Sequence, residues 1–233
     1  MKLLAVDFDK TFFISQDYQK NIDYANAFIE KGNLFIIVTG RHIQSLLSDI
    51  NHTTLKYHYL VCNDGGIIFD NNLNVIYQCN MPKHVVPSIV NLYKRSDCLD
   101  DWYIDTGLTI TKDINSSANG IIGHIRIKEG AHKLFTEIKN NYPEIDGYVS
   151  QNWINITEKS VNKGGSLFNL SKIININEKD VYTIGDNIND LSMSNYGFNS
   201  FCMTDSIDEL KYKTIKTYDS VYELIMDILK GGL

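Results

Sequence analysis

The sequence predicts an α/β fold in which a parallel sheet core carries an inserted α+β domain. Short apolar runs alternate with helical patterns in the first and last thirds of the chain, whereas the middle third alternates apolar with polar residues as antiparallel strands do. The 233 residues are enough for one main domain with a smaller insert. We therefore expect a core of residues 1–78 and 157–233 and an insert of residues 79–156.

The elements of the core follow from its apolar patterns. Continuous apolar runs that end at Gly, Thr or Asp are typical of buried parallel strands, and apolar residues at helical spacing lie between them. The predicted strands are 3–8, 34–38, 59–62, 181–184 and 198–203, with a hairpin of 67–69 and 75–78. The predicted helices are 18–31, 41–50, 163–174, 188–196 and 220–230.

In the insert, the patterns predict helices at 84–95 and 131–142 and strands at 103–105, 108–112, 121–128, 148–151 and 152–157. Alternation makes one face of these strands apolar, so that it can pack on the helices. The other face is expected to carry His124, Arg126, Trp153, Asn155, Thr109 and Thr111. That polar face is either a solvated surface or a lid over the non-reacting part of a substrate.

Composition narrows the function classes. The formal charge of −6 gives no electrostatic support to nucleic-acid binding or to an anionic membrane surface. Neither a signal-peptide core nor a membrane span is visible, so a cytoplasmic location is expected. The four cysteines form no CxxC pair, which indicates reduced, structural thiols.

Acidic residues follow the first predicted strand. Asp7 and Asp9 lie two residues apart, so on an extended chain their carboxylates point into the same cavity. Two carboxylates that close repel each other, which favours a divalent cation or a shared proton. The oxygen-rich setting suits Mg²⁺ better than zinc. Alone, the pattern also fits a loop with a helix-capping Asp.

Three further clusters lie near strand or helix ends. Thr39, Gly40 and Arg41 place a hydroxyl and free backbone N–H groups at a strand-to-helix junction, where they can bind an anion or simply cap a helix. The run 185–190, Gly-Asp-Asn-Ile-Asn-Asp, puts two carboxylates directly after a buried strand, and a cation would offset their cost. Lys163 at a helix start can neutralise a phosphate charge, although most such lysines are solvated.

Taken together and in this order, DFDKT, VTGR, NKGG and GDNIND resemble the four motifs of the haloacid dehalogenase-like hydrolase superfamily. The resemblance covers most of the chain and extends to the Cof-type subgroup, which inserts an α+β (type IIB) cap between the second and third motifs. It implies a Rossmann-like core, the cofactor Mg²⁺, and a phosphatase that hydrolyses a small phosphorylated metabolite, such as a sugar phosphate, through an aspartyl-phosphate on Asp7.

The resemblance also implies a role for each matched residue. Asp7 is the expected nucleophile, and Asp9 is the acid that protonates the leaving oxygen and later activates water. The expected phosphate-binding residues are Thr39, Gly40, Lys163 and Asn189. The expected metal ligands are Asp7, Asp9 through its backbone carbonyl, Asp186, and Asp190 directly or through water. The expected substrate contacts are Arg41, Asn63, Asp64, His124, Arg126 and Trp153.

Two alternatives stay open at this level. A phosphomutase or phosphotransferase would use the same aspartyl-phosphate, and a non-catalytic small-molecule-binding regulator would use the same scaffold without turnover. The intact Asp7, Asp9, Lys163, Asp186 and Asp190 speak against a decayed site. A dinucleotide-dependent dehydrogenase is disfavoured because no GxGxxG follows the first strand.

Overall fold

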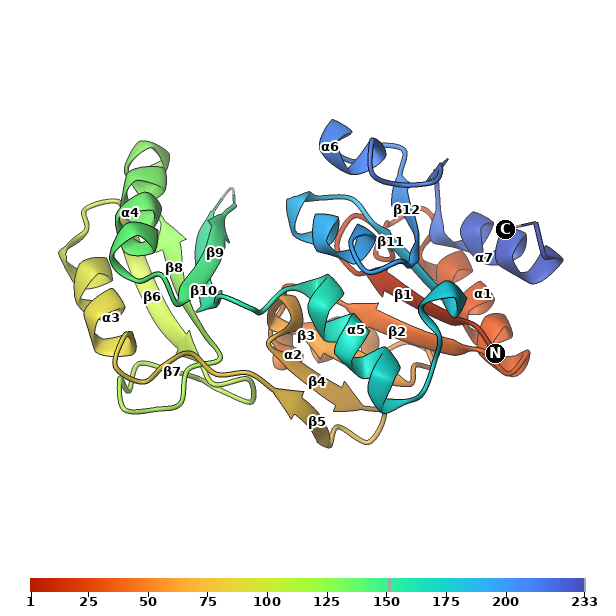
Figure 1. Cartoon of the computed structure of the whole chain (residues 1–233), viewed down its shortest axis with the longest axis horizontal. Helices are drawn as coiled ribbons and strands as arrows, with labels where there is room; N and C mark the ends of the chain where they lie inside the picture. The colour runs from red at the N-terminus through yellow and green to blue at the C-terminus, as the bar shows by residue number, and fades with distance from the viewer. Residues whose placement is uncertain (151, 233) are drawn as a thin grey trace. The chain divides into compact units, whose positions relative to one another are not determined.

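The computed structural model describes residues 1–150 and 152–232, which form two compact units (Figure 1). The core comprises Met1–Arg41, Ser45–Ile76 and Asn162–Leu233, and the cap comprises His42–Gln44 and Tyr77–Val161. The α/β class predicted from the sequence is confirmed, with a parallel sheet in the core and a separate antiparallel sheet in the cap. In the described part of the chain, every helix is too short or too polar to cross a bilayer.

The core is built on an eight-stranded sheet in the order β13-β12-β11-β1-β2-β3-β4-β5. Strands from β13 to β3 pair in parallel, and β4 runs antiparallel to β3. The strands are β1 Leu3–Asp7, β2 Leu34–Val38, β3 Tyr59–Cys62, β4 Ile67–Asp70, β5 Val75–Gln78, β11 Val181–Gly185, β12 Asn199–Met203 and β13 Thr217–Tyr218. Because β1 lies between β11 and β2, the loops that follow these three strands leave the sheet side by side.

Helices flank this sheet. Helix α1 packs on α7, and α5 packs on the short helices η1 and η3. The core helices are α1 Tyr18–Glu30, α2 Ile43–Ile50, α5 Lys163–Ile173, α6 Asp208–Lys211 and α7 Val221–Lys230, with 3₁₀ helices η1 Asn63–Gly65, η2 Glu178–Asp180 and η3 Ile188–Ser194. Of these, α6 was not predicted, nor was strand β13, and the helix expected at 188–196 is the 3₁₀ helix η3.

The cap is a five-stranded antiparallel sheet with two helices on one face (Figure 1). Its strands, in the order β7-β6-β8-β10-β9, are β6 Leu99–Asp105, β7 Ile110–Thr111, β8 Gly120–Ile125, β9 Ile145–Val149 and β10 Trp153–Glu158. The helices are α3 Val86–Arg95 and α4 Lys128–Asn141. Tyr93, Ile121 and Ile154 belong to the buried cluster between sheet and helices. The strand expected at 148–151 ends in a residue outside the described ranges.

The predicted cap sheet is wrong in several strand bounds and in the face of one residue: β6 begins at Leu99 and not at residue 103, and β7 covers only Ile110–Thr111. Strand β8 ends at Ile125 and not at Lys128, because the backbone N–H groups of Arg126 and Ile127 both donate to the carbonyl of Cys98 and so leave the ladder. Arg126 therefore lies beyond the strand. Thr111 pairs with the fully buried Ile104, and directly opposed residues share a face. Thr111 thus lies on the helix side of the sheet.

One buried side chain ties the helices of the core to the loop after β1. Asn21 on α1 is fully buried. Its Nδ2 donates to the carbonyl of Phe12 over 2.9 Å, and its Oδ1 accepts from the backbone N–H of Tyr222 at the start of α7, also over 2.9 Å. The loop that leaves β1 is therefore anchored to two helices through one amide.

We expect Asn21→Ala to lower the free energy of unfolding by about 2–3 kcal/mol, because it leaves a buried carbonyl and a buried N–H without partners. Denaturant unfolding followed by circular dichroism measures this loss. The control is Gln19→Ala on the same helix, whose exposed amide contacts only Asp23 among the interactions found. Equal stabilities of the two variants would contradict this role of Asn21.

Candidate active site

The candidate catalytic residues of the core lie at the carboxyl ends of neighbouring parallel strands. Asp7 is the last residue of β1 and pairs in register with Val38, the last residue of β2. Thr39 follows directly and is buried. Asp186 follows β11, the strand on the other side of β1. Open α/β sheets place their sites at this edge, so the fold brings the first, second and fourth motifs together.

The buried ammonium of Lys163 joins the third motif to the others. Lys163 begins α5 and its side chain is fully buried. Its Nζ donates to Oδ1 of Asp7 over 2.5 Å and to Oδ1 of Asp190 over 2.6 Å. A buried charge is tolerated only when it is paired and hydrogen-bonded. The interpretation of Lys163 as a solvated surface residue is therefore wrong.

The cluster holds more negative than positive charge. Burial raises the pKa of Asp7 well above its usual range; Lys163 opposes this rise, and Asp190 and Asp186 add to it. Burial likewise raises the pKa of Asp186, with a further contribution from Asp190. For Lys163, burial alone would lower the pKa, but Asp190 and Asp7 keep it above its ordinary value. Three carboxylates face one buried ammonium, and Lys10 adds a second positive charge near Asp186. A divalent cation bound among the three carboxylates would therefore be stabilising.

The donor set fits a hard divalent cation. Asp7, Asp186 and Asp190 each offer an oxygen, and these three oxygens lie within 4.8 Å of one another. All are carboxylates, which are the ligands that Mg²⁺ prefers. Of the three carboxylates, Asp190 accepts the most hydrogen bonds within the protein. Its Oδ1 accepts one from Lys163, and its Oδ2 accepts two from the backbone N–H groups of Asp186 and Asn187. About three of its roughly four acceptor sites are thus taken, which leaves Asp7 and Asp186 with more room for a metal.

The side chain of Asp9 is held by Arg41. Nε of Arg41 donates to Oδ2 of Asp9 over 2.7 Å, and Nη2 donates to Oδ1 over 2.5 Å. The third guanidinium nitrogen, Nη1, donates to Asp49 on α2 over 2.5 Å. The guanidinium also lies 5.0 Å from the ring of Phe8. The expected acid and an expected substrate contact are therefore bound to each other.

The turn after β3 joins the same edge of the sheet. Asn63 and Asp64 both adopt left-handed backbone angles, with φ of 52° and 54°, and such angles are costly for residues with a Cβ. The turn is held because the N–H of Asp64 donates to the carbonyl of Thr39, and the N–H of Asn63 to that of Arg41. Asn189 in turn donates from Nδ2 to Oδ1 of Asp64 over 2.9 Å. Asp64 thus connects the turn to the fourth motif.

Glycines allow the loops to approach this closely. A Cβ on Gly185 would lie 2.4 Å from Cγ of Asp190, and one on Gly164 would lie 2.0 Å from the carbonyl oxygen of Ser192. A Cβ on Gly65 would lie 2.5 Å from the carbonyl oxygen of Asn162. Each contact is with backbone or with a site residue, so each position excludes a side chain.

The structure thus brings together Asp7, Asp9, Thr39, Gly40, Arg41, Asn63, Asp64, Lys163, Asp186, Asn189 and Asp190 within the core. Sequence reasoning missed three contributors: Asp49, which binds Arg41; Thr11, whose Oγ1 donates to Asp186 over 3.3 Å; and Ser192, whose Oγ accepts from the N–H of Gly164. Thr11 stands in the DFDKT run and could have been found there. Asp49 and Ser192 carry no spacing signal.

The remaining candidates belong to the cap. On the sheet face opposite the helices, His124 lies 4.6 Å from the ring of Trp153, measured between centroids, and Nδ1 of His124 lies 2.6 Å from a carboxylate oxygen of Asp100. Tyr103 lies 6.2 Å from the ring of Trp153. Arg126 points its guanidinium at the carbonyl of Asp97. His124 and Trp153 therefore share a surface, and Arg126 does not extend it along β8.

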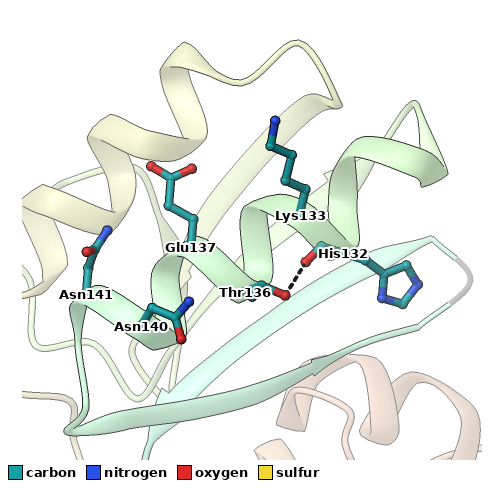
Figure 2. Close-up of a pocket in the computed structure, with 6 residues that line it drawn as sticks. All are labelled: His132, Lys133, Thr136, Glu137, Asn140 and Asn141. Carbon is teal, nitrogen blue, oxygen red and sulfur yellow. Dashed lines mark hydrogen bonds between the residues drawn. The ribbon is translucent and has the colours of Figure 1, made fainter.

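A separate hollow of about 650 Å³ lies on the exposed side of α4 (Figure 2). It is lined by His132, Lys133, Thr136, Glu137, Asn140 and Asn141. Thr136 donates its hydroxyl to the carbonyl of His132 over 2.8 Å, a local helix contact. The hollow is thus formed by one helix and contains none of the candidate catalytic residues.

The four ordered motifs, the carboxylate cluster around Lys163 and the α+β insert define a hydrolase of the haloacid dehalogenase-like class. The family model for haloacid dehalogenase-like hydrolases matches residues 4–144 and 115–223, and the chain belongs to this family. The resemblance stated from the motifs is therefore confirmed. Relatives of the chain include named phosphatases, and the enzyme class is phosphoric monoester hydrolase.

Among the relatives, the 5-amino-6-(5-phospho-D-ribitylamino)uracil phosphatase of Bacillus subtilis is 24% identical over 92% of this chain and 91% of its own length. A subclass IIB sugar phosphatase of the same superfamily superposes with a TM-score of 0.81 at 17% identity, covering 98% of this chain and 99% of its own. A haloacid dehalogenase-like hydrolase from B. subtilis superposes with a TM-score of 0.83 at 16% identity, covering 97% and 99%.

The close approach of α5 to η3 can be tested with two adjacent glycines. We expect Gly164→Ala to lower the free energy of unfolding by about 2 kcal/mol or more and to impair the site, since its Cβ meets the backbone of Ser192. Gly165→Ala is the control, because its Cβ would meet the hydroxyl end of Tyr196 at 3.1 Å, and a helical Gly→Ala change gains up to about 1 kcal/mol. Urea denaturation of both variants measures the difference. Similar stabilities would contradict the packing described.

Proposed function

We propose that the protein is a Mg²⁺-dependent phosphatase that hydrolyses a small phosphorylated metabolite through a phosphoryl group carried on Asp7. The observation that best supports this is the placement of Asp7. Its carboxylate ends the central strand, has one oxygen fixed by the buried Lys163, and belongs to an oxygen-only cluster with Asp186 and Asp190. The Asp7 carboxylate is thus held in one orientation and its charge is partly neutralised, and a weak nucleophile needs both in order to react.

The proposed reaction has two steps. In the first, a carboxylate oxygen of Asp7 attacks phosphorus, the bond between phosphorus and the ester oxygen breaks, and Asp9 gives its proton to the departing alcohol. In the second, water attacks the same phosphorus, Asp9 takes up a proton from that water, and the bond to Asp7 breaks. Phosphate leaves, and both carboxyl groups return to their starting states.

Positioning and charge carry most of the rate in such phosphoryl transfers. Lys163 would neutralise phosphoryl oxygens from its place beside Asp7, and the Thr39 hydroxyl and Asn189 amide would donate to them. Bound Mg²⁺ would reduce the repulsion between the Asp7 carboxylate and the phosphate, with Asp7 and Asp186 as its side-chain ligands. Asp190 would mainly position other residues of the site, because it is hydrogen-bonded to Lys163 and to the turn at Asp186.

The leaving group is the part of a phosphomonoester that varies from one substrate to another. We propose that His124 and Trp153 of the cap take part in choosing it, since an exposed indole beside an imidazole offers an apolar wall for a ring or sugar face. A phosphomutase would use the same first step and pass the phosphoryl group to a sugar hydroxyl. Release of inorganic phosphate, measured against retention of the phosphoryl group on the sugar, separates the two reactions.

Asp7→Asn should abolish hydrolysis of 4-nitrophenyl phosphate in the presence of Mg²⁺, because the amide cannot form the acyl phosphate. Circular dichroism should show an intact fold. Asp180→Asn is the control, as this carboxylate is exposed on η2. The covalent mechanism is wrong if Asp7→Asn keeps more than a small fraction of the wild-type rate.

Mg²⁺ should raise the melting temperature, since a ligand that binds the folded state alone stabilises it. Asp186→Asn should remove most of this shift. In the absence of metal the same variant should be as stable as the wild type or more so, because it removes a carboxylate whose pKa is raised by burial and by the charge of Asp190. Differential scanning fluorimetry with and without Mg²⁺ measures both effects. An undiminished Mg²⁺ shift in Asp186→Asn would exclude Asp186 as a ligand.

A further inference from the structure

Lys163 and Arg41 both form ion pairs with carboxylates of the core site, and the two cations differ in how exposed they are. The ammonium of Lys163 is fully buried between Asp7 and Asp190. The guanidinium of Arg41 is 24% exposed, and its partners Asp9 and Asp49 are 50% and 34% exposed. Solvent screens an exposed ion pair, so a competing anion can replace one partner there more easily than in a buried pair. Arg41 is therefore the cation whose partner an incoming anion can replace.

The bond between Arg41 and Asp9 conflicts with the role proposed for Asp9. Both oxygens of that carboxylate accept hydrogen bonds from the guanidinium. A carboxyl group that protonates a leaving oxygen must carry its proton on one of these two oxygens and turn that oxygen toward the ester. At least one of the two hydrogen bonds between Asp9 and Arg41 must therefore break before the phosphoryl group is transferred to Asp7. Asp49 would keep the guanidinium in place through Nη1 when that happens.

We propose that Arg41 selects phosphomonoesters that carry a second anionic group close to the ester oxygen. This group replaces Asp9 as the ion-pair partner of Arg41. The planar guanidinium matches a carboxylate or a phosphate with two parallel hydrogen bonds, the same geometry it now uses for Asp9. Binding the correct substrate thereby releases the acid. The inference rests on the proposed phosphatase function and adds its substrate class.

The geometry limits how far apart the two anionic groups of the substrate can be. Arg41 binds the carboxylate that would reach the ester oxygen, so a group bound by Arg41 lies about two hydrogen-bond lengths, or roughly 6 Å, from that oxygen. A carboxylate one or two bonds beyond the ester carbon satisfies this limit. Phosphoglycolate meets it, and 2-hydroxyethyl phosphate has a similar size without the second charge.

The test compares these two substrates in wild type, Arg41→Gln and Arg41→Lys with Mg²⁺ present. Wild type should prefer phosphoglycolate, and Arg41→Gln should lower kcat/KM for it by about ten-fold or more, mainly through KM. On 2-hydroxyethyl phosphate, which offers Arg41 no second anionic group, Arg41→Gln should lower kcat/KM far less than on phosphoglycolate. Arg41→Lys keeps the positive charge but cannot donate two parallel hydrogen bonds, so it should retain part of the preference for phosphoglycolate. Lys56→Gln, which breaks a surface ion pair with Glu30, is the control.

Equal losses of Arg41→Gln on both substrates would overturn the proposal, because Arg41 would then only support Asp9. An unchanged ratio of the two kcat/KM values, or a wild type without preference for phosphoglycolate, would overturn it as well. Hydrolysis of 4-nitrophenyl phosphate is measured in the same preparations. Turnover of that ester without the expected selectivity rejects this inference alone, whereas no turnover of any ester rejects the phosphatase function and the inference with it.

Discussion

The buried ammonium of Lys163 is the contact on which the rest of the site depends. It bonds to Asp7 at the end of β1 and to Asp190 in η3, two carboxylates that are themselves almost fully buried. Without this cation, the two would be unpaired charges in a medium of low polarity, a cost of about 3–5 kcal/mol when one partner of a buried pair is removed. Loops from distant parts of the chain are thus held together by one side chain.

Asp190 connects the ion pair with Lys163 to the backbone of the turn after β11. One of its oxygens binds Lys163, and the other accepts from two successive N–H groups in the turn after β11. The same carboxylate therefore sets both the position of the cation and the direction in which Asp186 leaves the strand. This arrangement explains why Gly185 must lack a Cβ, since the Asp190 carboxylate occupies that space. Asp190 therefore orders the site in addition to offering an oxygen to the carboxylate cluster.

Much of this arrangement could be predicted from sequence, because parallel strands deliver their C-terminal residues to one edge. Asp7, Thr39 and Asp186 needed only the strand assignments to be placed side by side. The phosphate-binding role expected of Lys163 came from the order of the motifs, and nothing in its own neighbours indicated that its side chain is buried. The bond between Arg41 and Asp49, eight residues apart across a helix start, follows no periodic rule.

The errors in the cap have a related cause. Alternation of apolar and polar residues continues through Ile127 and Lys128, although the chain has already left the sheet after Ile125. Hydrogen bonds to Cys98 end the strand, and that carbonyl belongs to the segment before β6. The face of Thr111 was decided in the same way, by its pairing with Ile104. The sequence pattern shows which residues of a strand alternate between the two faces of the sheet. Where the strand ends, and which of its residues face the helices, depends on its pairing with the neighbouring strand.

The two cations of the core divide the work of a site that is rich in carboxylates. Lys163 is enclosed, so its charge is always present for Asp7 and costs no reorganisation during the reaction. Arg41 is anchored by Asp49 and partly exposed, so under the proposal above its ion pair with Asp9 can be replaced by one with a ligand. A fixed cation would suit the part of the reaction common to every phosphomonoester, namely the phosphoryl group. An exchangeable cation would suit the part that varies, which is the leaving group, and the release of Asp9 would then depend on what has bound.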